Sequence, residues 1–335
     1  MKLFFFPSFY EKNTMRLSID DFSNLWKSRF HILSEMPHLA NGCIFRYSKV
    51  FLYFPAFSTW SKHKEPLLQM KRFLIHSLFL LVAVIGFTGC RSVPITGRKQ
   101  LMLTTSGYEN ELGVTSYAEY KEKFPRSTNE TYNRALDNCG KAIAEASGQT
   151  DFEWQFTVLQ TDTQNAFCLP GGKVAVYSGI MDVMQNEAEL AFVVAHEVGH
   201  AIARHGGERM SWGYLQSFGG ILVALGFQSD LASSAYSIST QVGVMLPFSR
   251  SNESEADLIG LILMSRAGYN PQAAVQFWSR FSQDSKSSML GNLMSTHPCD
   301  AKRIEAMKQN MAIAEAEYQK AQNKKGFGTV FRRGR

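Results

Sequence analysis

The sequence predicts an α+β fold that is mainly helical and contains a small β-sheet. Two patterns lead to this prediction. Several long segments are rich in apolar residues and are bounded by Gly, Pro or Asp. This is typical of helices and of the residues that begin or end them. Residues 152–177 instead alternate apolar and polar side chains around a Pro-Gly-Gly turn, which is typical of strands. At 335 residues, the chain is long enough for one or two domains with a real core.

The first 89 residues differ in charge from the rest. They hold 11 Lys/Arg and 5 Asp/Glu, whereas residues 90–335 hold 24 of each. The net charge of +6 therefore belongs to the leader and gives no reason to expect a nucleic-acid partner. Residues 1–69 show no sustained helix or strand period. They are either a misassigned or disordered extension ahead of a start at Met70, or a genuine extension of the protein.

Residues 70–89 have the layout of a secretory signal peptide. A basic start (MKR) precedes the apolar run Phe73–Phe87, which is shorter than the ~20 residues of a membrane span. The small residues before Cys90 resemble a bacterial lipoprotein signal. That resemblance implies a lipid on Cys90, attachment to a membrane and, with Arg91 next, a bacterial outer-membrane lipoprotein facing the periplasm. The alternative is a plain signal anchor followed by an incidental cysteine.

The remaining chain is predicted to form one domain between two extensions. Residues 90–104 are interpreted as an extended tether, 105–322 as the domain and 323–335 as a basic disordered tail. Ahead of residue 187 we expect two helices and a small sheet, with Ser127 or Thr128 capping the second helix. The expected elements are helices over Tyr108–Phe124 and Asn129–Ala146, a strand over Phe152–Leu159, and a hairpin of Asn165–Leu169 with Lys173–Tyr177.

The second half of the domain is predicted to be helical. Two Gly/Ala/Ser-rich stretches, Gly213–Gly226 and Leu231–Leu246, have apolar runs far too short for a membrane span. We interpret them as core or active-site cover, with a bilayer-dipping element as the alternative. The other expected helices are one opened by Glu187, one over Ser251–Ala267, one starting at Pro271, and a last one capped by Asp300 and running to about Gln322.

Residues 196–200 carry the pattern His-Glu-x-x-His on the buried helix that Glu187 opens. Helix positions four apart share a face with Cβ atoms about 5–6 Å apart, so His196 and His200 can bind one Zn²⁺ at about 2.0–2.1 Å. Glu197 is positioned to act on a metal-bound water rather than to bind the metal. Burying these three side chains without partners would be costly, which argues against a chance match. The small Gly199 would let another element approach closely.

An acidic cluster further along the chain can complete the metal site. Glu253 and Asp257 are four residues apart and share a helix face, while Glu255 points elsewhere. Zinc hydrolases of the gluzincin kind use two His and one Glu and leave a fourth position open. We therefore predict one Zn²⁺ per chain with Glu253 as third ligand, and Asp257 as hydrogen-bond partner of the far nitrogen of His196.

The motifs "HEVGHAIARHGGER", "LPFSRSNESEADLIGL" and "AGYNP" together resemble the zinc metallopeptidase family of the CAAX prenyl protease, HtpX and Oma proteases. "NAFCLPGGKVAVYSGIM" and the leader bring the resemblance nearest to bacterial lipoprotein and periplasmic members such as LoiP and BepA. It covers residues 94–307 and implies a zincin-like (gluzincin) fold with Glu253 on zinc. The chain departs from the prenyl-protease and HtpX branches in lacking their transmembrane helices.

The resemblance implies a metalloendopeptidase that attacks a peptide bond with zinc-bound water, Glu197 acting as general base. The strand Lys173–Tyr177, with Val174 and Val176, resembles the edge strand on which such enzymes bind an extended peptide. Misfolded or unassembled envelope proteins are the implied substrates, and outer-membrane assembly machinery is a further expected partner.

Several residues leave alternatives open. His297 resembles the histidine of the family's Thr-His-Pro loop, which implies a metal-proximal gate or a substrate contact, although a helix-entry residue also fits. A latent peptidase inhibited by His297 and a non-catalytic chaperone-like envelope lipoprotein are therefore the rival functions. His205, five residues beyond His200, is interpreted as a surface or core histidine. For Cys139, Cys168 and Cys299 we favour free thiols over a Cys168–Cys299 bridge.

Overall fold

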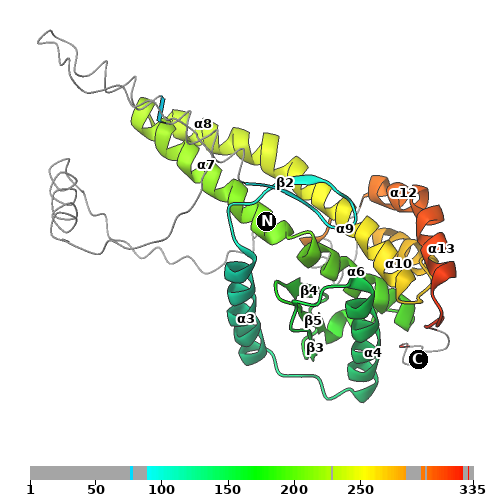
Figure 1. Cartoon of the computed structure of the whole chain (residues 1–335). Helices are drawn as coiled ribbons and strands as arrows, with labels where there is room; N and C mark the ends of the chain where they lie inside the picture. The colour runs from blue at the N-terminus through cyan, green and yellow to red at the C-terminus, as the bar shows by residue number, and fades with distance from the viewer. Residues whose placement is uncertain are drawn as a thin grey trace, which may run out of the picture. The chain divides into compact units, whose positions relative to one another are not determined.

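The computed structural model describes residues 76–77, 89–227, 229–283, 296–298, 300–326 and 331. The expectations for the extension, for almost all of the signal peptide and for Cys299 lie outside the described residues. The described part is mainly helical with small sheets, which confirms the predicted fold class (Figure 1). It contains no helix that is long and apolar enough to cross a membrane.

A three-stranded sheet has the order β3-β5-β4. β5 (Lys173–Tyr177) pairs in parallel with β3 (Gln155–Leu159) and antiparallel with β4 (Ala166–Leu169), so the predicted hairpin is present. The expectation that β5 is an edge strand is wrong, because both of its sides are paired. Val174 and Val176 are fully buried. β4 and β3 are the outer strands of this sheet.

Two helices flank this sheet. α3 (Ser106–Lys123) packs against β4 and β5, and α4 (Glu130–Ser147) packs against β3 (Figure 1). The cap of α4 is Asn129, whose side chain accepts hydrogen bonds from the N–H groups of Thr131 and Tyr132. The expected cap at Ser127 or Thr128 is therefore wrong by one or two residues. The short helix α5 (Ser178–Met181) ends the sheet.

The core is built around two packed helices, α6 (Glu187–Ile202) and α9 (Leu246–Arg266). Every residue of α6 except His200 is buried, as expected for a helix in the centre of a domain. The two helices approach closely at glycines. A Cβ on Gly199 would lie 3.1 Å from the carbonyl oxygen of Ala256, and one on Gly260 would lie 3.0 Å from the backbone nitrogen of His196.

Two further helices lie side by side and leave most apolar side chains exposed (Figure 1). These are α7 (His205–Phe227) and α8 (Asp230–Thr240), and the π-helical turn η2 (Gln241–Met245) joins α8 to α9. α8 has no buried residue. The interpretation of these stretches as core is therefore wrong. Their apolar residues do not pack on the domain as a core helix would.

The C-terminal helices are shorter than expected. α10 (Gln272–Gln283) packs on α6 and on α12 (Ala301–Gln309), whose N-cap is Asp300 as predicted. The expected single helix to Gln322 is interrupted at Asn310, after which α13 (Met311–Lys320) begins. The expected solvated tail also contacts the domain, since Phe331 is buried and its ring lies edge-on to that of Tyr132.

The segment interpreted as a tether is part of the domain. β1 (Cys90–Ser92) and β2 (Lys99–Leu101) form an antiparallel hairpin, and Val93 and Met102 beside it are buried. Between the strands, Ile95 takes a left-handed φ of 72° and Gly97 one of 71°. This N-terminal hairpin carries side chains that reach the functional site.

Candidate metal centre and active site

Four side chains from three segments converge on one point. His196 and His200 come from α6, Glu253 from α9 and His297 from the short segment ahead of α12. One ligand atom from each lies within 4.8 Å of all the others. The structure thus brings together the three predicted metal ligands and the predicted gate.

The spacing of these atoms fits a tetrahedral metal ion. His196 Nε2 lies 3.1 Å from His200 Nε2 and 3.5 Å from Glu253 Oε2, and His200 Nε2 lies 3.4 Å from Glu253 Oε1. A tetrahedron with bonds of about 2.0–2.1 Å has edges of about 3.3 Å. His297 Nδ1 lies 3.3 Å from His196 Nε2 and 3.1 Å from Glu253 Oε2, so it is close enough to two of these ligand atoms to bind the same ion.

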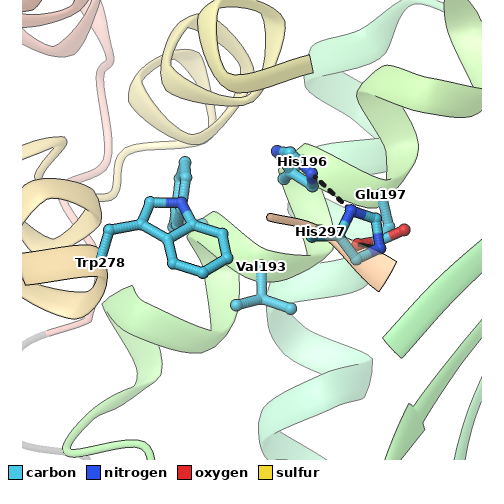
Figure 2. A pocket seen from close by; sticks show the side chains of 6 residues that line it. Val193, His196, Glu197, Trp278 and His297 are labelled. Carbon is cyan, nitrogen blue, oxygen red and sulfur yellow. Dashed lines mark hydrogen bonds and ion pairs between the residues drawn. The ribbon is translucent and has the colours of Figure 1, made fainter. Parts of the chain in front are cut away.

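Glu197 lies beside this cluster, in the position expected of a base. Its Oε1 is 3.4 Å from His297 Nε2, so the His297 ring lies between Glu197 and the ligand atoms (Figure 2). Both side chains line a small cavity with Trp278 and Val193. Burial raises the pKa of Glu197, which makes this carboxylate a stronger proton acceptor than an exposed one.

Burial and neighbouring charges set the protonation of the ligand residues. Burial lowers the pKa of His200 well below its usual range, which leaves a lone pair free for a metal. Burial opposes ionisation of Glu253, but the surrounding histidines outweigh it and lower the pKa of this carboxyl. At His196, burial is outweighed by Asp257 and Glu253, and the pKa rises to about 10. A metal therefore competes with a proton for His196.

The far nitrogen of His196 has the partner that the helix spacing predicts. Asp257 Oδ1 lies 3.0 Å from His196 Nδ1. Asp257 is buried and accepts two hydrogen bonds from Arg303 of α12, at 2.7 and 2.8 Å. A carboxylate in this position holds an imidazole ring in the orientation and tautomer that a metal requires.

The far nitrogen of His200 has a partner that the sequence analysis missed. His205 Nδ1 lies 2.8 Å from His200 Nδ1, and His205 Nε2 lies 3.0 Å from Glu255 Oε2. The sequence predicts that Glu255 points away from the face of Glu253 and Asp257, and that His205 lies at the surface or in the core. His205 is indeed buried, but it touches the ligand cluster. The available signal was the short distance in sequence between His205 and the motif.

The outer strand β4 packs more extensively against α6, the helix that carries Glu197, than β5 does. β4 packs along α6, whereas β3 packs on α4. Cys168 is half-buried on β4, and burial raises the pKa of its thiol. Cys139 and Cys168 are both free thiols.

Comparison with known proteins points to one family of peptidases. The model of Peptidase family M48 matches residues 130–311. The mitochondrial metalloendopeptidase OMA1 of Schizosaccharomyces pombe is 32% identical over 264 residues, which cover 76% of this chain and 77% of that protein. Human metalloendopeptidase OMA1 is 28% identical over 260 residues, which cover 71% and 49%.

A bacterial relative also matches. The β-barrel assembly-enhancing protease of Escherichia coli K12 is 25% identical over 224 residues, which cover 64% of this chain and 46% of that protein. This chain spans about half the length of the human and E. coli proteins. Several relatives are mitochondrial proteins of fission yeast, plant, budding yeast, cattle and human. The expected location as a bacterial outer-membrane lipoprotein facing the periplasm is therefore wrong.

Proposed function

Because the chain belongs to peptidase family M48 and is a metalloendopeptidase, we propose that it uses one zinc ion to cut misfolded or unassembled proteins. The observation that carries this proposal is the close spacing of the side-chain atoms of His196, His200 and Glu253, which suits a tetrahedral ion, with Glu197 next to them. Two imidazoles and one carboxylate are the ligand set of a catalytic zinc site with one position left for chemistry.

The side chains divide the reaction between them. His196, His200 and Glu253 would hold the zinc ion, which when bound acidifies water and polarises the scissile carbonyl. Glu197 takes a proton from the attacking water and passes it to the leaving amine. Burial supports this role, because it raises the pKa of Glu197 towards the range in which a base can both accept and release a proton.

The substrate would be bound as an extended segment along β4. β4 is an outer strand of its sheet and packs beside α6, the helix that carries Glu197. An extended peptide that pairs with an outer strand is held by its backbone, so the side-chain sequence matters little. This mode of binding favours unfolded segments of proteins over folded ones.

His297 supports a second candidate, a latent form of the same enzyme. Its Nδ1 is close enough to the ligand atoms of His196 and Glu253 to bind the same ion, and its Nε2 faces Glu197. In this arrangement His297 occupies the space that the attacking water needs. The segment carrying His297 would therefore have to move before a peptide is cut.

The decisive experiment compares casein cleavage by the full-length wild type with that by Glu197→Gln and His297→Ala, together with their zinc content. We expect Glu197→Gln to bind zinc and lose cleavage by at least about a hundredfold, and His297→Ala to cleave at least as fast as wild type. Cleavage by Glu197→Gln at the wild-type rate would refute the proposed chemistry. Inactivity of all three with zinc bound would favour a protein that binds substrates without cutting them.

We also infer that Cys90 attaches the domain to a membrane through a lipid. Its side chain is exposed at the start of β1, where a lipid would not disturb the packing of the hairpin. Mass spectrometry of the mature N-terminus tests this inference. A lipid-modified Cys90 would support it, and an unmodified Cys90 thiol would refute it.

A further inference from the structure

The second metal-binding histidine is connected to the N-terminal hairpin by a chain of buried polar contacts. His200 directs Nε2 at the ligand cluster and Nδ1 at Nδ1 of His205, 2.8 Å away. His205 Nε2 then meets Glu255 Oε2 at 3.0 Å. A single proton arrangement satisfies both links. His200 Nδ1–H donates to His205, and His205 Nε2–H donates to Glu255.

Glu255 is held in place by residues far away in the sequence. The Nε of Arg98 donates to Glu255 Oε2 at 2.7 Å, and the hydroxyl of Thr96 donates to Oε1. Both belong to the turn between β1 and β2. Arg98 is itself fixed by two parallel hydrogen bonds to Glu208 of α7, at 2.9 and 2.6 Å. Arg98 is partly exposed, at 28% of its side chain, Thr96 is also partly exposed, and both glutamates are buried.

This arrangement repeats, on the other side of the site, the support given to His196. There a carboxylate, Asp257, contacts the far nitrogen of the histidine and is held by Arg303. On the His200 side the carboxylate is Glu255 and the arginine is Arg98, with His205 inserted between histidine and carboxylate. Partners of this kind fix ring orientation and raise the basicity of a metal-binding imidazole.

We propose that Glu255, held by Arg98 of the N-terminal hairpin, positions the metal ligand His200 through His205. The inference rests on the proposed zinc site and extends it. Residues 93–102 become part of the metal centre, although they lie about a hundred residues ahead of the motif. Each of the two histidines is then supported by an arginine from a different end of the domain, Arg98 from the start and Arg303 from α12.

The test measures zinc affinity of the full-length protein by competition with a chromogenic chelator, and the visible absorption of the Co²⁺-loaded protein. Glu255→Gln is expected to weaken zinc binding by about 10–100-fold and to change the Co²⁺ spectrum. The matched control is Glu189→Gln, since Glu189 is also buried and paired with an arginine, Arg280, but its hydrogen bonds go to that arginine and to the backbone of Gln185 and not to a histidine. We expect the control to bind zinc as wild type does.

Variants of the partly exposed Arg98 test the same inference without a substitution at the buried Glu255. Arg98→Met should reproduce most of the loss in affinity, whereas Arg98→Lys, which keeps a cation beside Glu255, should restore part of it.

Wild-type zinc affinity and an unchanged Co²⁺ spectrum in Glu255→Gln, or in Arg98→Met if the former does not fold, would overturn the inference. If the wild-type protein bound no zinc, both the proposed function and this inference would fail. Equal losses in Glu255→Gln and Glu189→Gln would mean a general effect of packing and would also overturn it.

Discussion

Arg303 holds Asp257 by two nearly parallel hydrogen bonds and also lies 3.1 Å from Glu253. One buried arginine therefore fixes both the third metal ligand and the carboxylate behind His196. Its guanidinium plane also covers the ring of Trp278 and donates to the carbonyl of Pro298, next to His297. Arg303, in the first turn of α12, thus connects the proposed metal ligand Glu253 to the segment that carries His297.

Replacing Arg303 by lysine should therefore weaken the metal site. Arg303→Lys keeps the charge but loses the bidentate geometry, so we expect zinc affinity to fall by about tenfold, measured by chelator competition. Arg303→Met should in addition lower the free energy of unfolding by about 3–5 kcal/mol, because it leaves buried carboxylates without a counter-charge. Arg266→Lys, in the surface pair with Glu317, is the control and should change stability by less than about 1 kcal/mol. Equal zinc affinity in both lysine variants would contradict the role of Arg303.

Removing the imidazole of His297 should raise the turnover number. If Nδ1 of His297 fills the fourth ligand position, His297→Ala frees this position, and zinc stays bound by the other three residues. The expected result is a kcat several times that of wild type on a quenched fluorescent peptide, with zinc content unchanged. Loss of zinc from His297→Ala would show instead that His297 is an indispensable ligand, and a kcat below that of wild type with zinc bound would indicate a contact to the substrate.

The parts of the site that lie within single helices could be read from the sequence. His196, His200, Glu253 and Asp257 sit at four-residue spacing on α6 and α9, and helix geometry alone decides which of them share a face. The order of the sheet could not be read in this way. Whether β5 lies at the edge or the centre depends on its pairing with β3, which comes from 18 residues earlier in the chain and leaves no local pattern.

The contact of His205 with His200 could not be predicted from helix spacing. On a continuous helix, a residue five positions beyond His200 would point away from it. α6 ends at Ile202, however, and Arg204 adopts a left-handed φ of 53°, so the chain turns and His205 begins α7 facing back at His200. A left-handed arginine has no clear sequence signal, unlike a glycine in the same conformation. The contact of Glu255 with Arg98 could not be predicted from the sequence either, because it joins residues 157 positions apart.

The pH dependence of cleavage should report the burial of Glu197. A general base works in its ionised form, so kcat/KM is lost as the pH falls through the pKa of this carboxyl. Because burial raises that pKa, the acidic limb should lie above the ordinary glutamate value of 4.5. The measurement is kcat/KM against pH on a peptide without titratable groups, with zinc content checked at each pH. A profile that stays flat down to pH 4.5 would exclude Glu197 as the titrating base.

The close approach of α6 and α9 should be sensitive to a single methyl group. In Gly260→Ala the new Cβ would lie 3.0 Å from the backbone nitrogen and 3.1 Å from the Cα of His196, which cannot rotate away. We expect the free energy of unfolding to fall by about 1–3 kcal/mol in urea denaturation, and zinc affinity to fall with it, because α9 carries Glu253. Gly213→Ala in α7 is the control, since nothing lies within 4 Å of its Cβ, and it should be neutral or stabilising by up to about 1 kcal/mol. Equal stabilities of the two variants would mean that the helices can separate without cost.

Binding of the substrate along β4 predicts that the peptide backbone matters more than its side chains. A peptide paired with an outer strand exchanges N–H···O=C bonds with it at every second residue. Methylating the peptide nitrogen at single positions around the scissile bond should therefore raise KM by about tenfold or more at alternate positions, given about 1.4 kcal/mol for each lost interaction. Alanine substitution at the same positions should change kcat/KM by only a few fold. If alanine scanning had the larger effect and methylation showed no alternation, the substrate would be recognised by side-chain pockets and not by β4.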